Sequence, residues 1–221
     1  MNKLWHYGDS YAVCGPFETV FSQYIADHYG LSLRHLAAGG MGNFEIFSSL
    51  ISNDSRYEDG DVILINWSFF TRNTLTTIDG KLIGVDNLLV NFPELIEINK
   101  INSEAKNFLI DLTNNWSFME SVKLFNYIVH PYVEGLTKRG IKVKMVFLEQ
   151  YFPKNTNMTT TYNGILQNDS TITDRFNKWV IKFEPYYPNW FVQRDLMKGE
   201  SSHYAKGIQE MMATEYIKRM E

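Results

Sequence analysis

Short apolar segments alternate along the chain with longer segments whose apolar residues recur every three or four positions. The clearest short segment is Asp61-Val62-Ile63-Leu64-Ile65, which is apolar without alternation, as is typical of a strand buried on both faces. The longer segments have the period of a helix with one apolar face. Strands are predicted at 4–7, 31–36, 61–65 and 141–148, and helices at 18–28, 43–52, 116–138 and 204–220. This order predicts an α/β sandwich around a mainly parallel sheet.

Capping and turn-forming residues mark several ends of the predicted helices. Gly30 is placed to terminate the first helix, and Asn43 is the expected N-cap of the second. Pro131 is expected to kink the third helix, because proline has no N–H to donate. In the last helix, four apolar residues are expected to face inward: Ala205, Ile208, Met212 and Ile217.

The length and composition are those of a single domain. The chain has 221 residues, of which 44% are hydrophobic, and this is enough for one sizeable core. Two stretches show no clear periodicity: 69–102 is irregular, and 150–170 is polar and rich in Asn and Thr. We expect both stretches to be insertions in one domain that spans 1–221.

Charge and hydropathy limit the partners. The formal net charge of -4 gives no basic excess, so a nucleic-acid partner is not expected. No apolar run approaches the roughly 18 residues of a membrane span, and the N-terminus lacks the apolar segment of a Sec signal. We expect a soluble protein that is cytoplasmic or part of a larger particle. The single Cys14 excludes an internal disulfide, and the histidines have no metal-ligand spacing, so no metal and no cofactor are expected.

Three segments that can carry chemistry follow predicted strands. They are Ser10, the glycine loop at 39–43, and Asn66-Trp67-Ser68. The carboxyl ends of parallel strands meet at one edge of a sheet, where ligands gather. A serine hydroxyl becomes an effective nucleophile only when a neighbouring base takes its proton, and acyl transfer also needs donors for an oxyanion. Ser10 is therefore the candidate nucleophile, and the N–H groups of Ser10 and Gly42 are the candidate oxyanion donors.

The candidate base is His203, at the entrance of the last predicted helix. Glu200 lies three residues earlier and is the candidate to orient the imidazole, with Asp195 as the competing acid. A solvated surface histidine is the alternative interpretation of His203, and the alternative for Glu200 is an acid ahead of a helix, where the helix dipole favours negative charge.

Further side chains near the same edge are candidates for binding. Asn43 can be both a helix cap and a ligand, and Asn66 or Asn73 can supply a side-chain donor for the oxyanion. Trp67 and Arg72 are candidates to shape or charge a substrate cleft, although Trp67 fits equally well in the core.

The glycine loop does not fit a dinucleotide site. The pattern Gly-x-Gly-x-x-Gly fails here, because its last position, counted from Gly40, is Glu45.

Together, these residues resemble the SGNH or GDSL-type hydrolases, which are esterases and acylhydrolases. Gly8-Asp9-Ser10 matches the first block of that family, Gly39-Met41-Gly42 the second, and Glu200-Ser201-Ser202-His203 the last. The resemblance implies a flavodoxin-like three-layer α/β/α fold, with Ser10 as nucleophile, Gly42 as oxyanion donor and His203 as general base. The chain departs from the family at Tyr11, in the missing Gly-x-Asn-Asp of the third block, and at Glu200, where Asp is usual.

The primary hypothesis is a metal-independent serine esterase that hydrolyses a short acyl ester, with O-acetyl on a carbohydrate as the favoured substrate. The alternative is an inactive module that kept the fold, such as a glycan-binding component of a larger assembly. The altered third block and Glu200 motivate this alternative. The acyl group, the alcohol and the oligomeric state stay open.

Overall fold

The computed structural model describes residues 1–9, 12, 19–68, 73–76, 82–85, 123–147, 175–181 and 209–221. Its centre is a four-stranded sheet in the order β2-β1-β3-β6, in which every neighbouring pair is parallel. The strands are β1 (Lys3–Gly8), β2 (Ser32–His35), β3 (Val62–Trp67) and β6 (Lys142–Phe147). All four overlap the predicted strands, so the predicted parallel sheet is confirmed.

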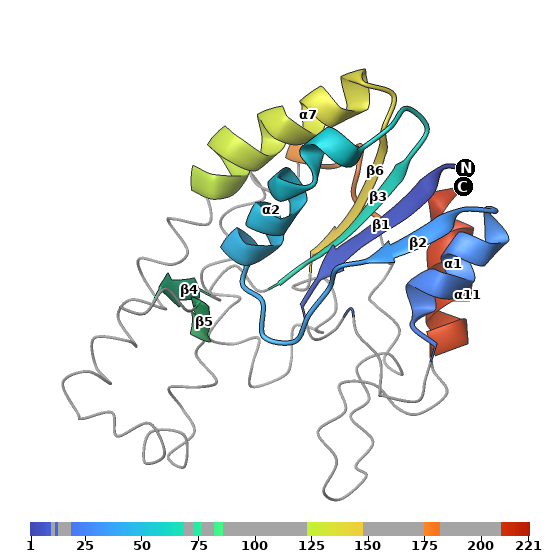
Figure 1. The fold of residues 1–221 in the computed structure, drawn as a ribbon, viewed down its shortest axis with the longest axis horizontal. Coiled ribbons are helices and arrows are strands. Elements are labelled where there is room, and N and C mark those ends of the chain that lie inside the picture. Colours follow the sequence, from blue (N-terminus) through green and yellow to red (C-terminus); the bar gives the residue numbers. More distant parts are fainter. Residues whose placement is uncertain are drawn as a thin grey trace, which may run out of the picture.

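Helices cover both faces of this sheet (Figure 1). On one face lie α1 (Phe21–His28) and α11 (Gln209–Met220), and on the other lie α2 (Asn43–Ser52) and α7 (His130–Lys138). The layers are therefore helix, sheet and helix, as expected for a three-layer α/β/α sandwich. The two chain ends lie at the edge of the sheet where the strands begin (Figure 1).

The sheet extends by one further bridge beyond β6. Val180 forms a parallel bridge with Met145, and Ile181 N–H donates to the Met145 carbonyl oxygen at 2.8 Å. No strand is predicted at this position from the sequence. The short segment around Val180 therefore occupies a fifth position in the sheet.

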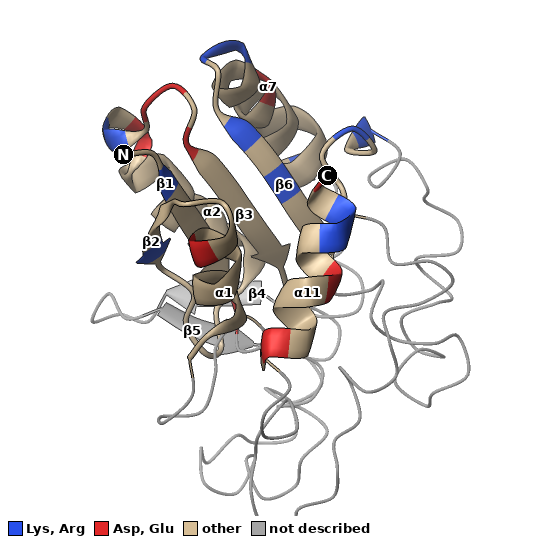
Figure 2. Cartoon of the chain, turned by 90° about the vertical axis from the view of Figure 1, so that its right-hand side faces the viewer, with Lys and Arg blue, Asp and Glu red and all other residues tan. Residues whose placement is uncertain are grey.

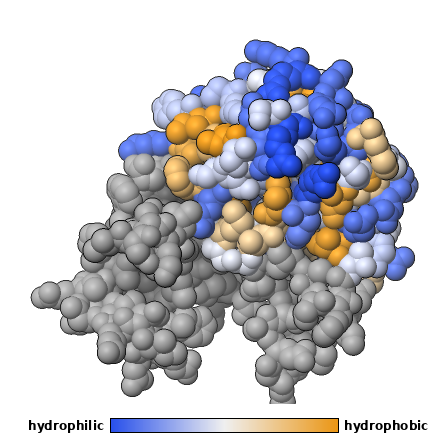
Figure 3. Space-filling view, in the orientation of Figure 1, coloured by the Kyte–Doolittle hydropathy of each residue, from blue (hydrophilic) through white to orange (hydrophobic). Residues whose placement is uncertain are grey.

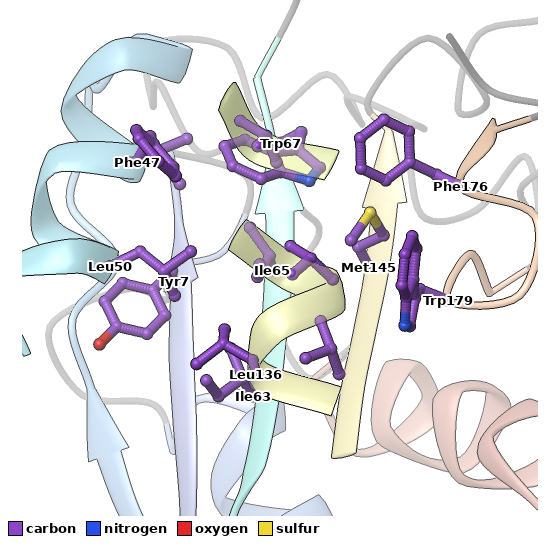
Figure 4. Close-up of a cluster of buried hydrophobic side chains, with 14 of the residues drawn as sticks. Tyr7, Phe47, Leu50, Ile63, Ile65, Trp67, Leu136, Met145, Phe176 and Trp179 are labelled. Carbon is purple, nitrogen blue, oxygen red and sulfur yellow. The ribbon is translucent and has the colours of Figure 1, made fainter. Parts of the chain in front are cut away.

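Each face of the sheet packs on its own hydrophobic cluster. Ile63, Ile65 and Trp67 of β3 point to the cluster under α2 and α7, which Figure 4 shows in close-up. Val62 and Leu64 point to the opposite cluster, under α1 and α11. Because successive strand residues face opposite sides, burial of both sides explains why the sequence of β3 does not alternate.

The first half of β6 is covered less well than the second. Lys142 is exposed and Lys144 is partly buried, and both appear as blue bands in Figure 2. Met145, Val146 and Phe147 are fully buried. This gradient explains why the sequence of the strand alternates first and is then wholly apolar.

Glycine terminates α1 as predicted. Gly30 has a φ of 64°, and Leu31 N–H donates to the Ala26 carbonyl oxygen at 2.8 Å while Gly30 N–H donates to that of Asp27 at 3.2 Å. This pair of hydrogen bonds forms a Schellman motif, which favours glycine at the left-handed position.

The start of α2 corrects one prediction. The N-cap is Gly42 rather than Asn43, which is the first helical residue. Glu45 reaches back and its Oε2 accepts the Gly42 N–H at 2.8 Å. The carboxylate therefore satisfies a helix donor that would otherwise lack an intrahelical partner, and this favours a start at Gly42.

Two further predictions are corrected between β3 and β6. The predicted helix 116–138 is, within the described residues, a π-helical segment η4 (Leu124–Val129) followed by α7. Pro131 lies in the first turn of α7, directly after the π-helical segment, and the backbone stays helical through Val129 and His130. The stretch 69–102, predicted to be irregular, contains the antiparallel pair β4 (Asn73–Thr76) and β5 (Leu82–Val85).

In the described part of the last helix, the predicted inward-facing residues pack against the core. Met212 is fully buried and Ile217 packs against the same cluster, whereas Ala205 and Ile208 lie outside the described residues. The predicted loop at 150–170 also lies outside them.

Small apolar patches interrupt a largely hydrophilic surface on the face seen in Figure 3. Among exposed large apolar side chains, Phe44 and Ile51 belong to α2. Within the part of the chain that the structure describes, no helix is both long and apolar enough to cross a bilayer.

Candidate active site

Three loops meet at the edge of the sheet where the strands end. The register pairs Gly8 of β1 with Asn66 of β3, so the residues after each strand emerge next to one another. Gly8 and Asp9 come from the first loop, Gly42 and Asn43 from the second, and Ser68 from the third. The predicted residues Ser10, Arg72, Glu200 and His203 lie outside the described residues, as does Asp195. The structure therefore describes the framework of the candidate site.

A hydrogen-bonded chain of buried polar groups connects these three loops. Ser68 Oγ donates to Asp9 Oδ2 at 2.8 Å, and Asn43 Nδ2 donates to the Ser68 carbonyl oxygen at 3.1 Å. Asp9 and Ser68 are 1% and 0% exposed, and Asn43 is also buried. The sequence places Ser68 in one of the three segments expected at this edge, Asn66-Trp67-Ser68, but does not indicate its hydrogen-bond partners.

Gly8 makes a close backbone approach possible at the end of β1. A Cβ at this position would lie 2.5 Å from Ala12 Cβ and 2.9 Å from Asn66 Cβ. The Ala12 N–H donates to the Asp9 carbonyl oxygen at 2.9 Å. Ser10 lies in sequence between these two hydrogen-bonded residues, immediately after the close approach.

The Gly42 N–H, a predicted oxyanion donor, already has an acceptor. It donates to Glu45 Oε2 at 2.8 Å, so a carboxylate occupies the hydrogen-bonding position that a bound oxyanion needs. Gly42 has a φ of -85°, which any residue can adopt, whereas Gly40 has a φ of 82°. The left-handed conformation in this loop therefore belongs to Gly40.

The Asn66 side chain takes part in a buried network on the α1 and α11 face. Its Nδ2 donates to Tyr216 Oη at 2.6 Å, and its Oδ1 lies 3.1 Å from His6 Nε2. The Nδ1 atoms of His6 and His35 are 3.1 Å apart. The network thus links β2, β1, β3 and α11 in one line.

Burial controls the charge state of this network. Desolvation and the neighbouring His35 lower the pKa of His6 to about 3, against the opposing effect of the hydrogen bond to Asn66. Desolvation also lowers the pKa of His35. His6 is therefore neutral at pH 7.

Trp67 lies in the core on the other face of the sheet. It is 1% exposed, and its ring packs edge to face on Phe125 with the centroids 4.8 Å apart (Figure 4). Its Nε1 has no hydrogen-bond partner among the described residues. The observed position corresponds to the core interpretation of Trp67.

The described residues contain no group of three or more His, Cys, Asp or Glu side chains that could hold a metal ion. The described framework offers backbone N–H groups and hydrogen-bonded carboxylates instead. Backbone N–H groups can stabilise an anion, and a hydrogen-bonded carboxylate can hold a loop in place.

The comparisons with known proteins agree with this architecture. No protein-family model matches the sequence, and a search of curated proteins finds no match. A solved structure from Desulfitobacterium hafniense, assigned to the G-D-S-L lipolytic family, aligns with a TM-score of 0.51 at 12% identity, covering 99% of each chain. A lipase/acylhydrolase from Enterococcus faecalis aligns with a TM-score of 0.50 at 9% identity, covering 99% of this chain and 94% of the other. The chain therefore has the fold of the SGNH, or GDSL-type, hydrolases.

Proposed function

We propose that the protein is a serine esterase of the SGNH type. The observation that carries the proposal is the framework around Gly8-Asp9-Ser10: a close-packed glycine, a buried Asp9 held by Ser68, and the start of α2 at the same edge of the sheet. Asp9 is only 1% exposed, and a buried carboxylate is costly unless its oxygens accept hydrogen bonds, so the turn that precedes Ser10 is held in one arrangement. The fold shared with lipolytic proteins supports the same chemistry.

The proposed mechanism is acyl transfer through a covalent intermediate. Ser10 Oγ attacks the carbonyl carbon of the ester while its proton passes to His203, and the N–H groups of Ser10 and Gly42 stabilise the oxyanion. The bond to the alcohol oxygen then breaks, and the alcohol leaves with the proton from His203. Water attacks the acyl-enzyme by the reverse route and releases the acid. Glu200, or Asp195 in its place, orients the imidazole.

The proposed substrate is a short acyl ester, with an O-acetyl group on a carbohydrate as the favoured case. Arg72 follows the third strand in sequence and remains a proposed binding residue, whereas Asn43, beside Gly42, is buried and donates its Nδ2 to the Ser68 carbonyl oxygen. Asn66 and Trp67 make a weaker case as ligands, because Asn66 is hydrogen-bonded to Tyr216 and Trp67 packs on Phe125.

The second candidate is an inactive binding module with the same fold. One observation favours it: the Gly42 N–H donates to Glu45, and the Asn66 amide donates to Tyr216, so two predicted oxyanion donors are engaged within the protein. In this case the same edge of the sheet would bind a glycan without cleaving an ester.

Covalent labelling distinguishes the two candidates. The wild-type chain should turn over p-nitrophenyl acetate and react with a fluorophosphonate at Ser10, and mass spectrometry of peptides identifies the modified residue. Ser10→Ala should abolish labelling and most turnover, whereas Ser55→Ala, at an exposed serine in the short helix after α2, should change neither. A folded wild-type chain that neither labels nor turns over would support the binding module.

A further inference from the structure

We infer that Ser68 is a positioning residue for the nucleophile, and this inference rests on the proposed esterase function. Ser68 makes two hydrogen bonds with opposite roles. Its hydroxyl donates to the side chain of Asp9, and its carbonyl oxygen accepts from the side chain of Asn43. One residue therefore contacts both the neighbour of the proposed nucleophile and the neighbour of the proposed oxyanion glycine.

The burial of Asp9 makes its hydrogen bond to Ser68 important. A buried carboxylate is costly unless its oxygens accept hydrogen bonds, and Asp9 is 1% exposed. Ser68 Oγ supplies such a bond at 2.8 Å. Loss of the hydroxyl should therefore weaken the hold on Asp9 Oδ2 and allow the side chain to rotate or shift.

A displacement of Asp9 would also move Ser10. Asp9 is joined to Ser10 by a peptide bond, and its carbonyl oxygen accepts the Ala12 N–H at 2.9 Å. Gly8, on the other side, is paired with Asn66 in the sheet, and there is no space for a side chain between it and Ala12. Asp9 is thus the residue through which the end of β3 can set the direction of the Ser10 N–H and hydroxyl.

The second hydrogen bond fixes the other half of the proposed oxyanion site. Asn43 Nδ2 holds the Ser68 carbonyl oxygen at 3.1 Å, and Asn43 immediately follows Gly42 at the start of α2. Ser68 therefore sets the spacing between two loops that supply the proposed oxyanion donors. Displacements of about 1 Å in such a site can slow a reaction about a hundredfold.

The test compares two buried serines. Ser68→Ala removes a hydroxyl that is hydrogen-bonded, whereas Ser22→Ala removes a fully buried hydroxyl in α1 that has no partner among the described residues. Both variants lose the same single oxygen atom. Ser68→Ala should lower kcat for p-nitrophenyl acetate and the limiting rate of fluorophosphonate labelling by about tenfold to a hundredfold, with KM nearly unchanged.

The rates are measured well below the unfolding temperature of each variant and divided by its folded fraction from circular dichroism, so that lost stability does not count as lost activity. Ser22→Ala should stay within twofold of wild type. If Ser68→Ala does not fold, Ser68→Cys serves in its place, since a thiol is a weaker donor, and it should also lower kcat.

Each outcome has a separate meaning. A wild-type chain that does not react at Ser10 overturns the proposed function and this inference together. An active wild type with a Ser68→Ala variant as fast as Ser22→Ala overturns the positioning role alone. A Ser68→Ala variant with raised KM and unchanged kcat does the same, because it would assign Ser68 to substrate binding.

Discussion

The Nδ1 atoms of His6 and His35 lie 3.1 Å apart, so one of the two nitrogens must accept and the other must donate. His6 Nε2 faces the side-chain oxygen Oδ1 of Asn66 at 3.1 Å and therefore carries a hydrogen. Neutral His6 then accepts at Nδ1 from His35. If both imidazoles were protonated, two N–H groups would face each other at the Nδ1 atoms, so acid destabilises this contact.

The first prediction concerns stability at low pH. The pKa of His6 falls from 6.5 to about 3 on folding, and that of His35 also falls. Between pH 6.5 and about 3 the unfolded chain binds more protons than the folded one, so the free energy of unfolding decreases as the pH falls. The slope from His6 alone approaches about 1.4 kcal/mol per pH unit.

Urea unfolding at a series of pH values measures this slope. Two other titratable side chains belong to this network. His35 on β2 contacts His6 directly, and Tyr216 on α11 is connected to His6 by Asn66. His6→Gln should reduce the slope, whereas His28→Gln, at an exposed histidine, should not. Equal slopes in wild type and His6→Gln would show that His6 is not the responsible group.

The second prediction concerns the link between α11 and the sheet. Tyr216→Phe removes the hydroxyl that accepts from Asn66 Nδ2 at 2.6 Å and leaves a buried amide donor without this partner. The free energy of unfolding should fall by about 1–3 kcal/mol. Chemical denaturation measures the loss, with Tyr127→Phe as the control because Tyr127 is 75% exposed. A loss no greater than in the control would mean that water replaces the hydroxyl.

The third prediction compares two glycines. Gly8→Ala should destabilise the chain by about 1–3 kcal/mol, because its Cβ would lie 2.5 Å from Ala12 Cβ. Gly135→Ala, inside α7 with no atom within 4 Å of the added Cβ, should instead stabilise the chain by about 0.5–1 kcal/mol. Thermal unfolding should move the midpoints of the two variants in opposite directions, and shifts of the same sign would refute the comparison.

The fourth prediction concerns the contact between Glu45 and Gly42, and it assumes the proposed esterase function. Glu45 competes with the oxyanion for one N–H, so Glu45→Ala should react faster at Ser10 although α2 loses about 0.5–2 kcal/mol of capping energy. Glu45→Gln keeps an acceptor without the charge and should be intermediate in both properties. Labelling rates and melting curves rank the wild type and the two variants by reactivity and by stability. If the rate falls together with stability, Glu45 supports the site and does not compete with the oxyanion.

Most of the fold could be predicted from the sequence because a strand that is buried on both faces has an uninterrupted apolar sequence. Val62 to Ile65 are apolar without interruption, and β3 lies at the centre of the sheet. The prediction was less accurate where a single side chain decides a boundary, as Glu45 does at the start of α2. The π-helical turns before Pro131 and the pair β4 and β5 have no comparable pattern in their short sequences.

The candidate site was predictable only as far as its place along the chain. The sequence places Gly8-Asp9-Ser10, the glycine loop at 39–43 and Asn66-Trp67-Ser68 at the ends of predicted strands, and therefore at one edge of the sheet. The partner of each side chain depends on the strand register, because the contact between Ser68 and Asp9 joins residues 59 positions apart. The same register turns Asn66 toward Tyr216, 150 positions away, and no local pattern could indicate that.

The position of the two chain ends has a practical consequence. Both lie at the edge of the sheet where the strands begin, opposite the loops that carry Gly8 and Gly42 (Figure 1). An affinity tag or a tether to a solid support at either end would therefore leave the loop edge facing the solution. Immobilised protein should react with a soluble probe as readily as free protein, which allows each variant to be assayed, washed and unfolded on the same support.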